Sequence, residues 1–410
     1  KELVEKMKEI GCFSDFKNMI LLDALINNED RHYGNFGFLK DNYPEQRCII
    51  NKVGGSVSYK LCDERLTKSR ILGKVKRTLT RKSAGWDWML YDPVIPPSVD
   101  FIHTFNHVCD IRIPWAASFE STIPRTNQTV NRFWENWQSS FRPDSFTRRS
   151  IDLMLQDSCK ALIAISDSAY KIQENMINML EYTGKHELFD KMYVLHPPQN
   201  VLVGEECVVK KFQNLNKYEF IFLGRDFFRK GCDIFIDSLM HYQKDVQFHL
   251  TVISELGYLG YANKADKQKW GCKLTSLPWI TWYKSLDNSS CLELLKSAHI
   301  GVLPTLQDTY GYSTLEMQAC GCPVISTNIR ACSEINNDDC GWIVPLKKDN
   351  IGGEALRRTA EERERCDYEL RTGIELCLNN IFNAKPEDLQ KKAIQGIMRI
   401  RTEHDPVEYG

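Results

Sequence analysis

Residues 218–231 read YEFIFLGRDFFRKG, and this stretch decides the fold. Its first part, 218–223, is an apolar and aromatic segment of strand length that ends at Gly224. Cations follow the glycine, and apolar residues at helical spacing then continue from Cys232 to Tyr242. A buried strand, a glycine turn and a helix in this order are typical of one unit of a parallel α/β sheet.

The same alternation continues toward the C-terminus. Further strands are predicted at 247–253, 279–282, 300–304 and 323–326, with helices around 291–295 and 313–320. Strands that alternate with helices of this length indicate a parallel sheet covered by helices on both faces. Such a doubly wound domain binds its ligands at the carboxyl ends of the strands.

The middle of the chain shows a second, weaker set of the same elements. Strands are predicted at 99–103, 115–119, 161–165 and 193–198, with a helix at 146–157 and a helix N-cap at Ser166 or Asp167. A linker is predicted at 199–216. The expected fold is therefore α/β, with two Rossmann-like doubly wound domains that face a cleft, at 48–205 and 206–375. Residues 1–47 form a small N-terminal appendage, and 376–410 form a helical segment that packs back across the domains.

Bulk composition excludes several classes of protein. A chain of 410 residues suits two domains. A formal net charge of −1 argues against a nucleic-acid partner, which usually needs a basic excess. No segment approaches the roughly 18 apolar residues of a spanning helix, and the first residues lack the layout of a secretion signal. The 15 cysteines are scattered and odd in number, without a Cys-x-x-Cys pair, which favours free thiols in a reducing cytoplasm over metal ligands or disulfides.

The loop after residues 218–223 has the composition of an anion site. Gly224 ends the strand, and Arg225 and Lys230 lie just before the expected helix. A helix N-terminus offers unpaired N–H groups and a positive dipole, and nearby cations add charge-assisted hydrogen bonds. A diphosphate fits this chemistry. Gly and Lys are also common in ordinary loops, so this loop taken alone leaves both interpretations open.

A second loop, Asp308 to Glu316, strengthens the argument. Gly311, Ser313 and Thr314 place small residues at another helix start, again suited to phosphate. The two acids lie eight positions apart, so one can approach a sugar while the other reaches ribose hydroxyls from within the helix. The alternative makes Glu316 an ordinary helix acid and Asp308 a solvated loop residue, and it leaves the pairing of two anion-ready helix starts with two acids unexplained.

From about Phe220 to Pro345 the chain resembles family-4-type retaining glycosyltransferases of glycosyltransferase group 1, which have the GT-B fold. Three segments match in order. They are 224–231, then Pro304 with the acid–seven–acid motif 308–316, and then 319–327 followed by Glu334. The resemblance extends more loosely over 99–198, where 100–103 and 163–166 look like landmarks of an acceptor-binding domain.

The resemblance implies a role for each matched residue. Arg225 and Lys230 would hold the donor phosphates, Asp308 would contact the transferred sugar, and Glu316 would contact the ribose. The remaining donor-site candidates are the loop residues Gly224, Tyr310, Gly311, Tyr312, Ser313 and Thr314. Catalysis would rest on electrostatic stabilisation of the departing diphosphate, with no metal and no cofactor besides the nucleotide-diphosphate-sugar substrate.

Two departures from the family pattern concern the reacting centre. The first acid of the motif is usually Glu, whereas Asp308 is one methylene shorter, which puts its reach to the sugar in doubt. The family often has a second histidine two residues after the one at His103, and this chain has Phe105 there. His103 and Glu120 are the acceptor-side candidates for catalysis, although an isolated histidine is more often a structural hydrogen-bonding residue.

Two N-terminal features fall outside this pattern. Residues 28–36 resemble the catalytic loop of HipA-type and lipid-kinase-like phosphotransferases, in which Asp30 would act on the acceptor hydroxyl and Asn35 would hold magnesium. No nucleotide-binding lobe precedes it, so we interpret it as a fragment. Residues Lys68–Lys82 carry seven cations and no acid at near-helical apolar spacing. They form either an ordinary solvated helix or a peripheral contact with an anionic membrane surface.

The sequence therefore predicts a cytoplasmic retaining hexosyltransferase, with a peripheral position at the inner membrane face as an option. Its donor is a nucleotide-sugar, and its acceptor is a hydroxyl of a glycan, a lipid-linked sugar or a cell-surface polysaccharide precursor. Two rival hypotheses remain. One is phosphotransfer through Asp30 and Asn35, and the other is an inactive module that binds nucleotide-sugars without turnover.

Overall fold

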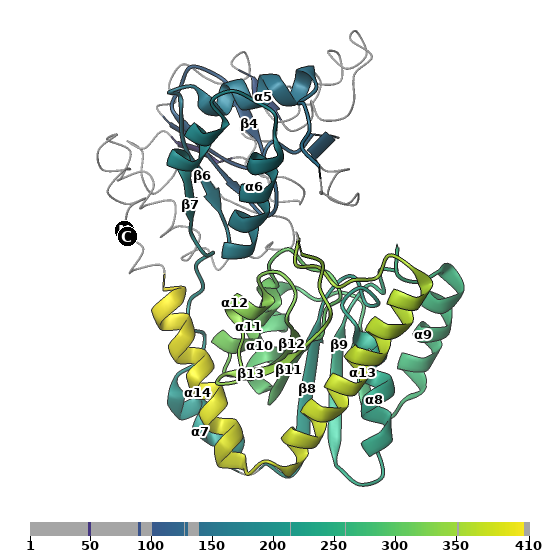
Figure 1. Cartoon of the computed structure of the whole chain (residues 1–410). Coiled ribbons are helices and arrows are strands. Elements are labelled where there is room, and N and C mark those ends of the chain that lie inside the picture. The colour runs from purple at the N-terminus through teal and green to yellow at the C-terminus, as the bar shows by residue number, and fades with distance from the viewer. Residues whose placement is uncertain are drawn as a thin grey trace. The chain divides into compact units, whose positions relative to one another are not determined.

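The structure is a computed structural model that describes residues 101–126, 128–129, 139–213, 215–258, 260–350 and 352–405, with the backbone of 48–50 and 89–91. The described residues divide into two compact units, one that ends at Pro198 and one that spans Gln199–Asp405 (Figure 1). The predicted appendage at 1–47, with Asp30 and Asn35, and the basic segment Lys68–Lys82 lie outside the described residues.

The first unit is built on a parallel sheet with the strand order β1-β3-β5-β6-β7. Its strands are β1 (Cys48–Ile50), β3 (Phe101–Phe105), β5 (Trp115–Phe119), β6 (Cys159–Ala164) and β7 (Met192–Val194). A separate parallel pair joins β2 (Met89–Tyr91) to β4 (Val108–Asp110). The helical elements are α5 (Ser145–Leu155), α6 (Asp167–Met179) and the 3-10 segment η4 (Lys185–Lys191). Strand β5 is buried along its whole length, as expected for the centre of a sheet covered on both faces.

The C-terminal end of α5 is held by one lysine. Lys191 Nζ donates to the carbonyl oxygens of Met154, Leu155 and Gln156 at 3.0, 3.0 and 2.8 Å. These carbonyls accept no hydrogen bond from a later residue of the helix. A cation at this end also interacts favourably with the negative end of the helix dipole.

Substituting Lys191→Met should therefore lower the free energy of unfolding by about 1–2 kcal/mol. Urea unfolding followed by circular dichroism would measure it. Lys171→Met is the matched control, because Lys171 only pairs with Glu174 on an exposed helix surface and should cost less than about 0.5 kcal/mol. Equal losses in the two variants would contradict the capping role.

The second unit is built on a six-stranded parallel sheet with the order β10-β9-β8-β11-β12-β13. The strands are β8 (Tyr218–Leu223), β9 (Phe248–Ile253), β10 (Ile280–Tyr283), β11 (Ile300–Leu303), β12 (Val324–Thr327) and β13 (Gly341–Val344). Numbered from β8, this order is 3-2-1-4-5-6, which is that of a Rossmann domain. From β8 the chain adds β9 and β10 on one side and then β11, β12 and β13 on the other. The strand order therefore reverses between β8 and β11, and ligands of such domains bind at this switch point.

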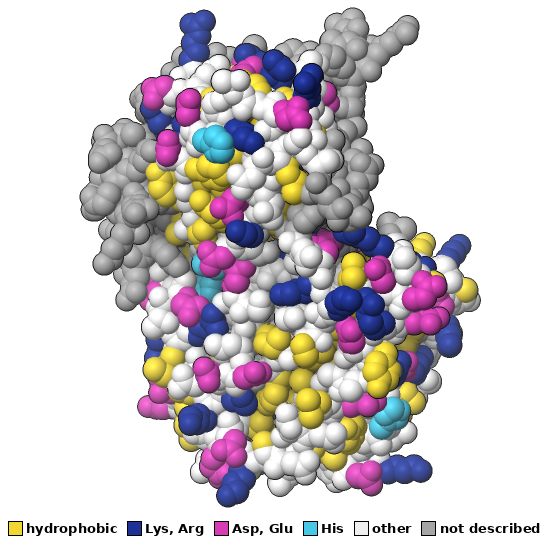
Figure 2. All heavy atoms as spheres, in the orientation of Figure 1, with side chains coloured by type: hydrophobic (Ala, Val, Ile, Leu, Met, Phe, Trp, Pro, Cys, Tyr) yellow, Lys and Arg dark blue, Asp and Glu magenta, His cyan; other side chains and the backbone are white. Residues whose placement is uncertain are grey.

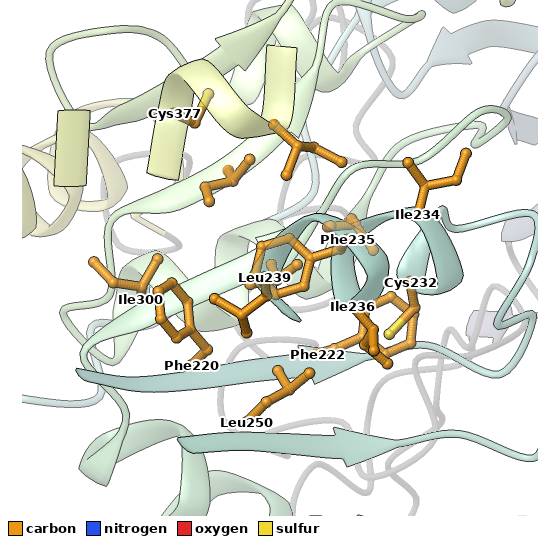
Figure 3. Packing of buried hydrophobic residues seen from close by; sticks show 14 of the residues in the cluster. Phe220, Phe222, Cys232, Ile234, Phe235, Ile236, Leu239, Leu250, Ile300 and Cys377 are labelled. Atoms are coloured by element: carbon orange, nitrogen blue, oxygen red, sulfur yellow. The ribbon is translucent and has the colours of Figure 1, made fainter. Parts of the chain in front are cut away.

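Helices cover both faces of this sheet, as predicted. They are α7 (Glu205–Gln213), α8 (Cys232–Leu239), η5 (Met240–Tyr242), α9 (Lys264–Ser276), α10 (Asn288–Ser297), α11 (Tyr312–Ala319), α12 (Cys332–Ile335), α13 (Ala360–Asn383) and α14 (Pro386–Glu403). Alternate residues of β8 enter different cores. Phe220 and Phe222 pack with Phe235 and Leu239 of α8 (Figure 3), while Ile221 packs on the opposite face with α10 and α11.

The predicted linker at 199–216 is wrong in part, because it contains helix α7. Val208 and Phe212 of α7 are fully buried, and α7 and α11 both pack against α14. The second unit also begins earlier than the predicted boundary at 205/206. Gln199 N–H donates to the His404 carbonyl at 2.8 Å and Leu202 N–H to the Ala319 carbonyl at 2.9 Å, and these two backbone bonds tie the segment to the second unit. Packing of the C-terminal segment across both units stays a prediction.

The surface matches the near-zero net charge of the chain. In the space-filling view, Lys and Arg side chains are interspersed with Asp and Glu side chains over the described face of both units (Figure 2). Among the described residues, no helix combines the length and the apolar character needed to span a membrane.

Candidate functional site

Two loops of the second unit meet at the switch point of the sheet. The first follows β8 and extends from Gly224 to Gly231, and the second follows β11 and extends from Pro304 to Gly311. Because β8 and β11 are hydrogen-bonded neighbours, their carboxyl ends bring the two loops together. The two sequence motifs predicted for the donor therefore lie in one place.

Gly231 sets how closely the loops approach. Its φ of 70° lies in the left-handed region, and a Cβ at this position would lie 2.3 Å from the carbonyl oxygen of Pro304. A glycine is therefore required both for the backbone conformation and for the contact. It also precedes α8 as an N-cap without a side chain, and the first N–H groups of that helix bond to the Phe227 carbonyl and to the Asp233 carboxylate of the first turn.

Arg229 joins the two loops, a role that the sequence did not reveal. Its guanidinium pairs with Asp226 in its own loop, and its Nη1 donates to the Gln307 carbonyl at 3.1 Å. Its own carbonyl accepts from Leu306 N–H at 2.9 Å. Burial alone would lower the pKa of Arg229, but the Asp226 carboxylate keeps the pKa raised. This arginine is thus a charged cross-link between the loops.

Lys230 and Asp308 form the central ion pair of the site. Lys230 Nζ donates to Asp308 Oδ2, and the side chains are only 13% and 12% exposed. The other carboxylate oxygen, Oδ1, accepts from Tyr310 N–H at 3.4 Å. Burial by itself would raise the pKa of Asp308, but the Lys230 and Arg229 cations hold it below its ordinary value. Asp308 is therefore an ionised, nearly buried carboxylate and not the solvated loop acid of the alternative interpretation.

The second helix start has a similar design. Gly311, with a φ of 94°, precedes α11 and supplies no side-chain cap. Thr314 N–H bonds to the Gly311 carbonyl at 2.8 Å, while the buried Thr314 Oγ1 has no hydrogen-bond partner among the described residues. A buried hydroxyl without a partner is uncommon, and because Thr314 is fully buried its hydroxyl is not open to a ligand. Ser313 lies beside it and is half-buried.

The two tyrosines of the motif differ in exposure. Tyr310 is fully buried, and its ring lies 4.9 Å from that of the half-buried Tyr312, centroid to centroid. Tyr310 therefore fixes the loop to the protein interior, and Tyr312 has an exposed part that a ligand could contact.

Arg225 and Glu316 lie at the margins of the site. Arg225 is 45% exposed, and its Nε is 3.8 Å from Glu255 Oε1, a distance at which solvent screens most of the interaction. Glu316 is half-buried on α11. Burial raises the pKa of Cys291 to about 11, and the Glu316 carboxylate adds to this effect. Glu316 therefore lies near Cys291 of α10.

A series of buried polar contacts also holds the loop that carries Asp308, through its neighbour Gln307. Gln307 Oε1 accepts from the Tyr261 hydroxyl at 3.0 Å, and its Nε2 donates to Glu354 Oε1 at 2.9 Å. Glu354 pairs in turn with Arg330, and these two side chains are 10% and 5% exposed. Arg330 has a φ of 38°, a conformation that favours glycine. Its position just after β12 was visible in the sequence, but nothing there indicated this backbone geometry.

The acceptor-side candidates lie in the first unit, where His103 is in the middle of β3 and Glu120 directly follows β5. His103 is fully buried, its Nε2 is 2.8 Å from Ser118 Oγ, and burial lowers its pKa to about 3. Glu120 is partly exposed, pairs with Arg125 at 2.6 Å and accepts from Asn106 Nδ2 at 3.4 Å. His103 is thus a neutral imidazole within the sheet, while Glu120 is an accessible carboxylate held in place by two partners.

Comparison with known proteins fits this geometry. Residues 217–361 match the family Glycosyl transferases group 1. This segment contains both loops and the Lys230–Asp308 pair. The chain is also 23% identical over 166 residues to a D-inositol 3-phosphate glycosyltransferase of Paenarthrobacter aurescens (strain TC1), in a match that covers 36% of this chain and 38% of that relative. The chain thus spans well under half of the length of that relative.

Solved structures show the same two-domain architecture. Sucrose-phosphate synthase of Thermosynechococcus elongatus is 13% identical, with a TM-score of 0.51 over 87% of this chain and 80% of that one. The apo structure of OtsA is 9% identical, with a TM-score of 0.50 over 86% of this chain and 77% of that one. At these identities the likeness concerns the fold, and it agrees with the predicted GT-B fold class of two parallel-sheet α/β domains.

Proposed function

We propose that this chain transfers a glycosyl unit from a nucleotide-sugar to a hydroxyl acceptor with retention of configuration. One observation carries the proposal. Within the segment that matches the glycosyl transferases, two helix starts with glycine N-caps flank a buried Lys230–Asp308 pair at the switch point of a Rossmann-ordered sheet. Two positive helix ends and a lysine suit a diphosphate, and a carboxylate beside them suits sugar hydroxyls.

The proposed division of labour follows the exposure of each side chain. Lys230 and the N–H groups at the start of α11 would hold the diphosphate, and the positive end of the α8 dipole would help to stabilise its charge as it departs. Arg225, at the exposed margin, would add charge from the solvent side. Glu316 would accept hydrogen bonds from the ribose, and Asp308 from the transferred sugar. Positive charge from the chain itself would replace a metal ion, and no further cofactor is proposed.

On the acceptor side we propose a hydroxyl of a glycan or of a lipid-linked sugar, such as a polysaccharide precursor. Glu120 is the candidate for contact with that hydroxyl, because its carboxylate is partly exposed and oriented by Arg125. His103 would have a structural role within the sheet, through its contact with Ser118, since its buried ring stays neutral. Action in the cytoplasm, with the basic segment Lys68–Lys82 at an anionic membrane face, belongs to the same proposal.

The test is a thermal-shift screen of the chain against UDP, GDP, ADP and dTDP and their sugar conjugates. Binding to the folded state stabilises by mass action, by about 2.7 kcal/mol at a ligand concentration of one hundred times Kd. One nucleotide class should stand out, and its sugar conjugate should release nucleoside diphosphate slowly in water. No shift with any compound would overturn the proposal, and binding without release would favour the inactive-module hypothesis.

Glu316→Gln should weaken binding of the selected nucleotide about 10- to 100-fold while the melting temperature stays within a degree or two. A hydrogen bond to a charged acceptor contributes about 1.5–3 kcal/mol, against about 1 kcal/mol for a neutral amide, so the loss of charge weakens each bond from a ribose hydroxyl. Isothermal titration measures the change. Glu293→Gln, on an exposed turn of α10 paired with Lys296, is the matched control and should leave affinity unchanged. Parent-like affinity in the Glu316 variant would make that residue an ordinary helix acid.

A further inference from the structure

We propose that Asp308 competes with the nucleotide's diphosphate for Lys230, and that it thereby weakens binding of the nucleoside diphosphate product. The inference rests on the proposed function and adds to it a means of discriminating product from donor. It starts from one ion pair: Lys230, the lysine that we propose for the diphosphate, is paired with the Asp308 carboxylate.

The contacts around Asp308 keep its carboxylate next to Lys230. Asp308 is held from two sides, by Lys230 at Oδ2 and by Tyr310 N–H at Oδ1. The loop that carries it is fixed as well, because the Gln307 carbonyl accepts from Arg229 Nη1. The carboxylate is therefore poorly placed to swing away when an anion arrives at Lys230, and the new anion must share the lysine with it.

Arg229 offsets little of the repulsion between Asp308 and an arriving anion. Its guanidinium is engaged with Asp226 and with the Gln307 carbonyl, so its charge already has a counter-ion. Lys230 is the direct ion-pair partner of Asp308, and both side chains are largely shielded from solvent. Shielded charges interact more strongly than solvated ones, so a phosphate oxygen at Lys230 experiences a substantial repulsion from Asp308.

Donor and product differ in how they meet this carboxylate. In a nucleotide-sugar, the sugar follows the second phosphate and can donate hydroxyl hydrogen bonds to Asp308, which offsets the repulsion. After transfer the sugar is gone and the second phosphate carries an additional negative charge, so that Asp308 faces an anion with no donor between them. The same side chain thus supports the donor and disfavours the product, which promotes product release.

The experiment compares the parent with Asp308→Asn, Asp308→Ser and Asp308→Glu. Each is titrated with the nucleoside diphosphate that gives the largest shift in the panel, and with its sugar conjugate, at low and high salt. The Asn and Ser variants should bind the nucleoside diphosphate on the order of tenfold more tightly at low salt. Their affinity for the sugar conjugate should rise less or fall. Asp308→Glu keeps the charge and should bind the diphosphate no more tightly than the parent.

Thermal melting supplies a second readout on the same proteins. Without ligand, Asp308→Asn should melt below the parent, because Lys230 then lacks its counter-ion, yet the nucleoside diphosphate should raise its melting temperature by more. Neutral variants that bind the diphosphate no more tightly than the parent would overturn the inference and leave the proposed function in place. Absence of binding by the parent as well would overturn the proposed function and this inference together.

Discussion

Lys230→Met should lower the free energy of unfolding of the second unit by about 3–5 kcal/mol and should remove measurable nucleoside diphosphate binding. The first effect arises because the substitution leaves Asp308 nearly buried with no direct counter-ion, which is the costly way to break an ion pair. The second arises because Lys230 is the cation located between the two helix starts. Urea unfolding and isothermal titration measure the two effects separately.

The pH dependence of this loss has a definite sign. In the parent, the pKa of Asp308 in the folded state lies below its ordinary value, so its contribution to stability is present above the unfolded pKa of about 3.9 and is lost as pH falls through the folded value. In Lys230→Met, burial dominates and raises that pKa, so the carboxyl can take up a proton in the folded state. The deficit of the variant should therefore shrink between pH 7.5 and pH 4.5.

A double variant serves as the internal control. Lys230→Met combined with Asp308→Leu removes both charges and should recover most of the stability, because apolar residues of similar volume often replace buried ion pairs without loss. It should remain unable to bind the nucleotide. A single variant as stable as the parent at pH 7.5, or a deficit that grows on acidification, would contradict the assignment of Asp308 as an ionised buried partner.

Much of the second unit could be predicted from the sequence, because its strands are short apolar segments separated by glycines and helical spacing. The strands predicted at 218–223 and 247–253 correspond to β8 and β9 almost residue for residue. Strand β13 was missed. It spans only Gly341–Val344, and its glycine approaches the Val324 carbonyl so closely that only tertiary context identifies it as a strand.

The candidate site could be predicted in its residues but not in its contacts. Spacing placed Lys230 and Asp308 in two loops, and parallel topology brought the loops together. The pairing of the two side chains depends on how far each loop extends toward the other, and this distance depends on tertiary packing that no local sequence pattern predicts. Arg229 shows the same limit. In the sequence Arg229 is one of several cations in the loop after β8. In the structure it pairs with Asp226 and donates to the Gln307 carbonyl.

Gly231→Ala should cost about 2–5 kcal/mol in the free energy of unfolding and should also impair nucleotide binding. The left-handed φ of 70° accounts for about 1–2 kcal/mol of this in a residue with a Cβ. The remainder arises because the new methyl would lie 2.3 Å from the Pro304 carbonyl oxygen, an overlap that backbone movement must relieve at about 1–3 kcal/mol.

The overlap connects this stability effect to the site. Pro304 begins the loop that ends with Asp308, so relief of the clash moves the second loop away from the first. The Lys230–Asp308 pair spans those two loops and should lengthen or break. Nucleoside diphosphate affinity should therefore fall by an order of magnitude or more, measured by titration on protein that is still folded at the temperature used.

Gly260→Ala separates backbone strain from steric overlap. Gly260 has a φ of 79°, almost the same conformation, yet a Cβ there would meet nothing within 4 Å among the described residues. That variant should lose only the 1–2 kcal/mol of strain and should bind the nucleotide as the parent does. If both glycine variants lose the same stability and keep the same affinity, contact between Gly231 and Pro304 does not set the spacing of the two loops. A larger loss confined to Gly231→Ala would show that a glycine between β8 and α8 is required for the two loops after β8 and β11 to meet.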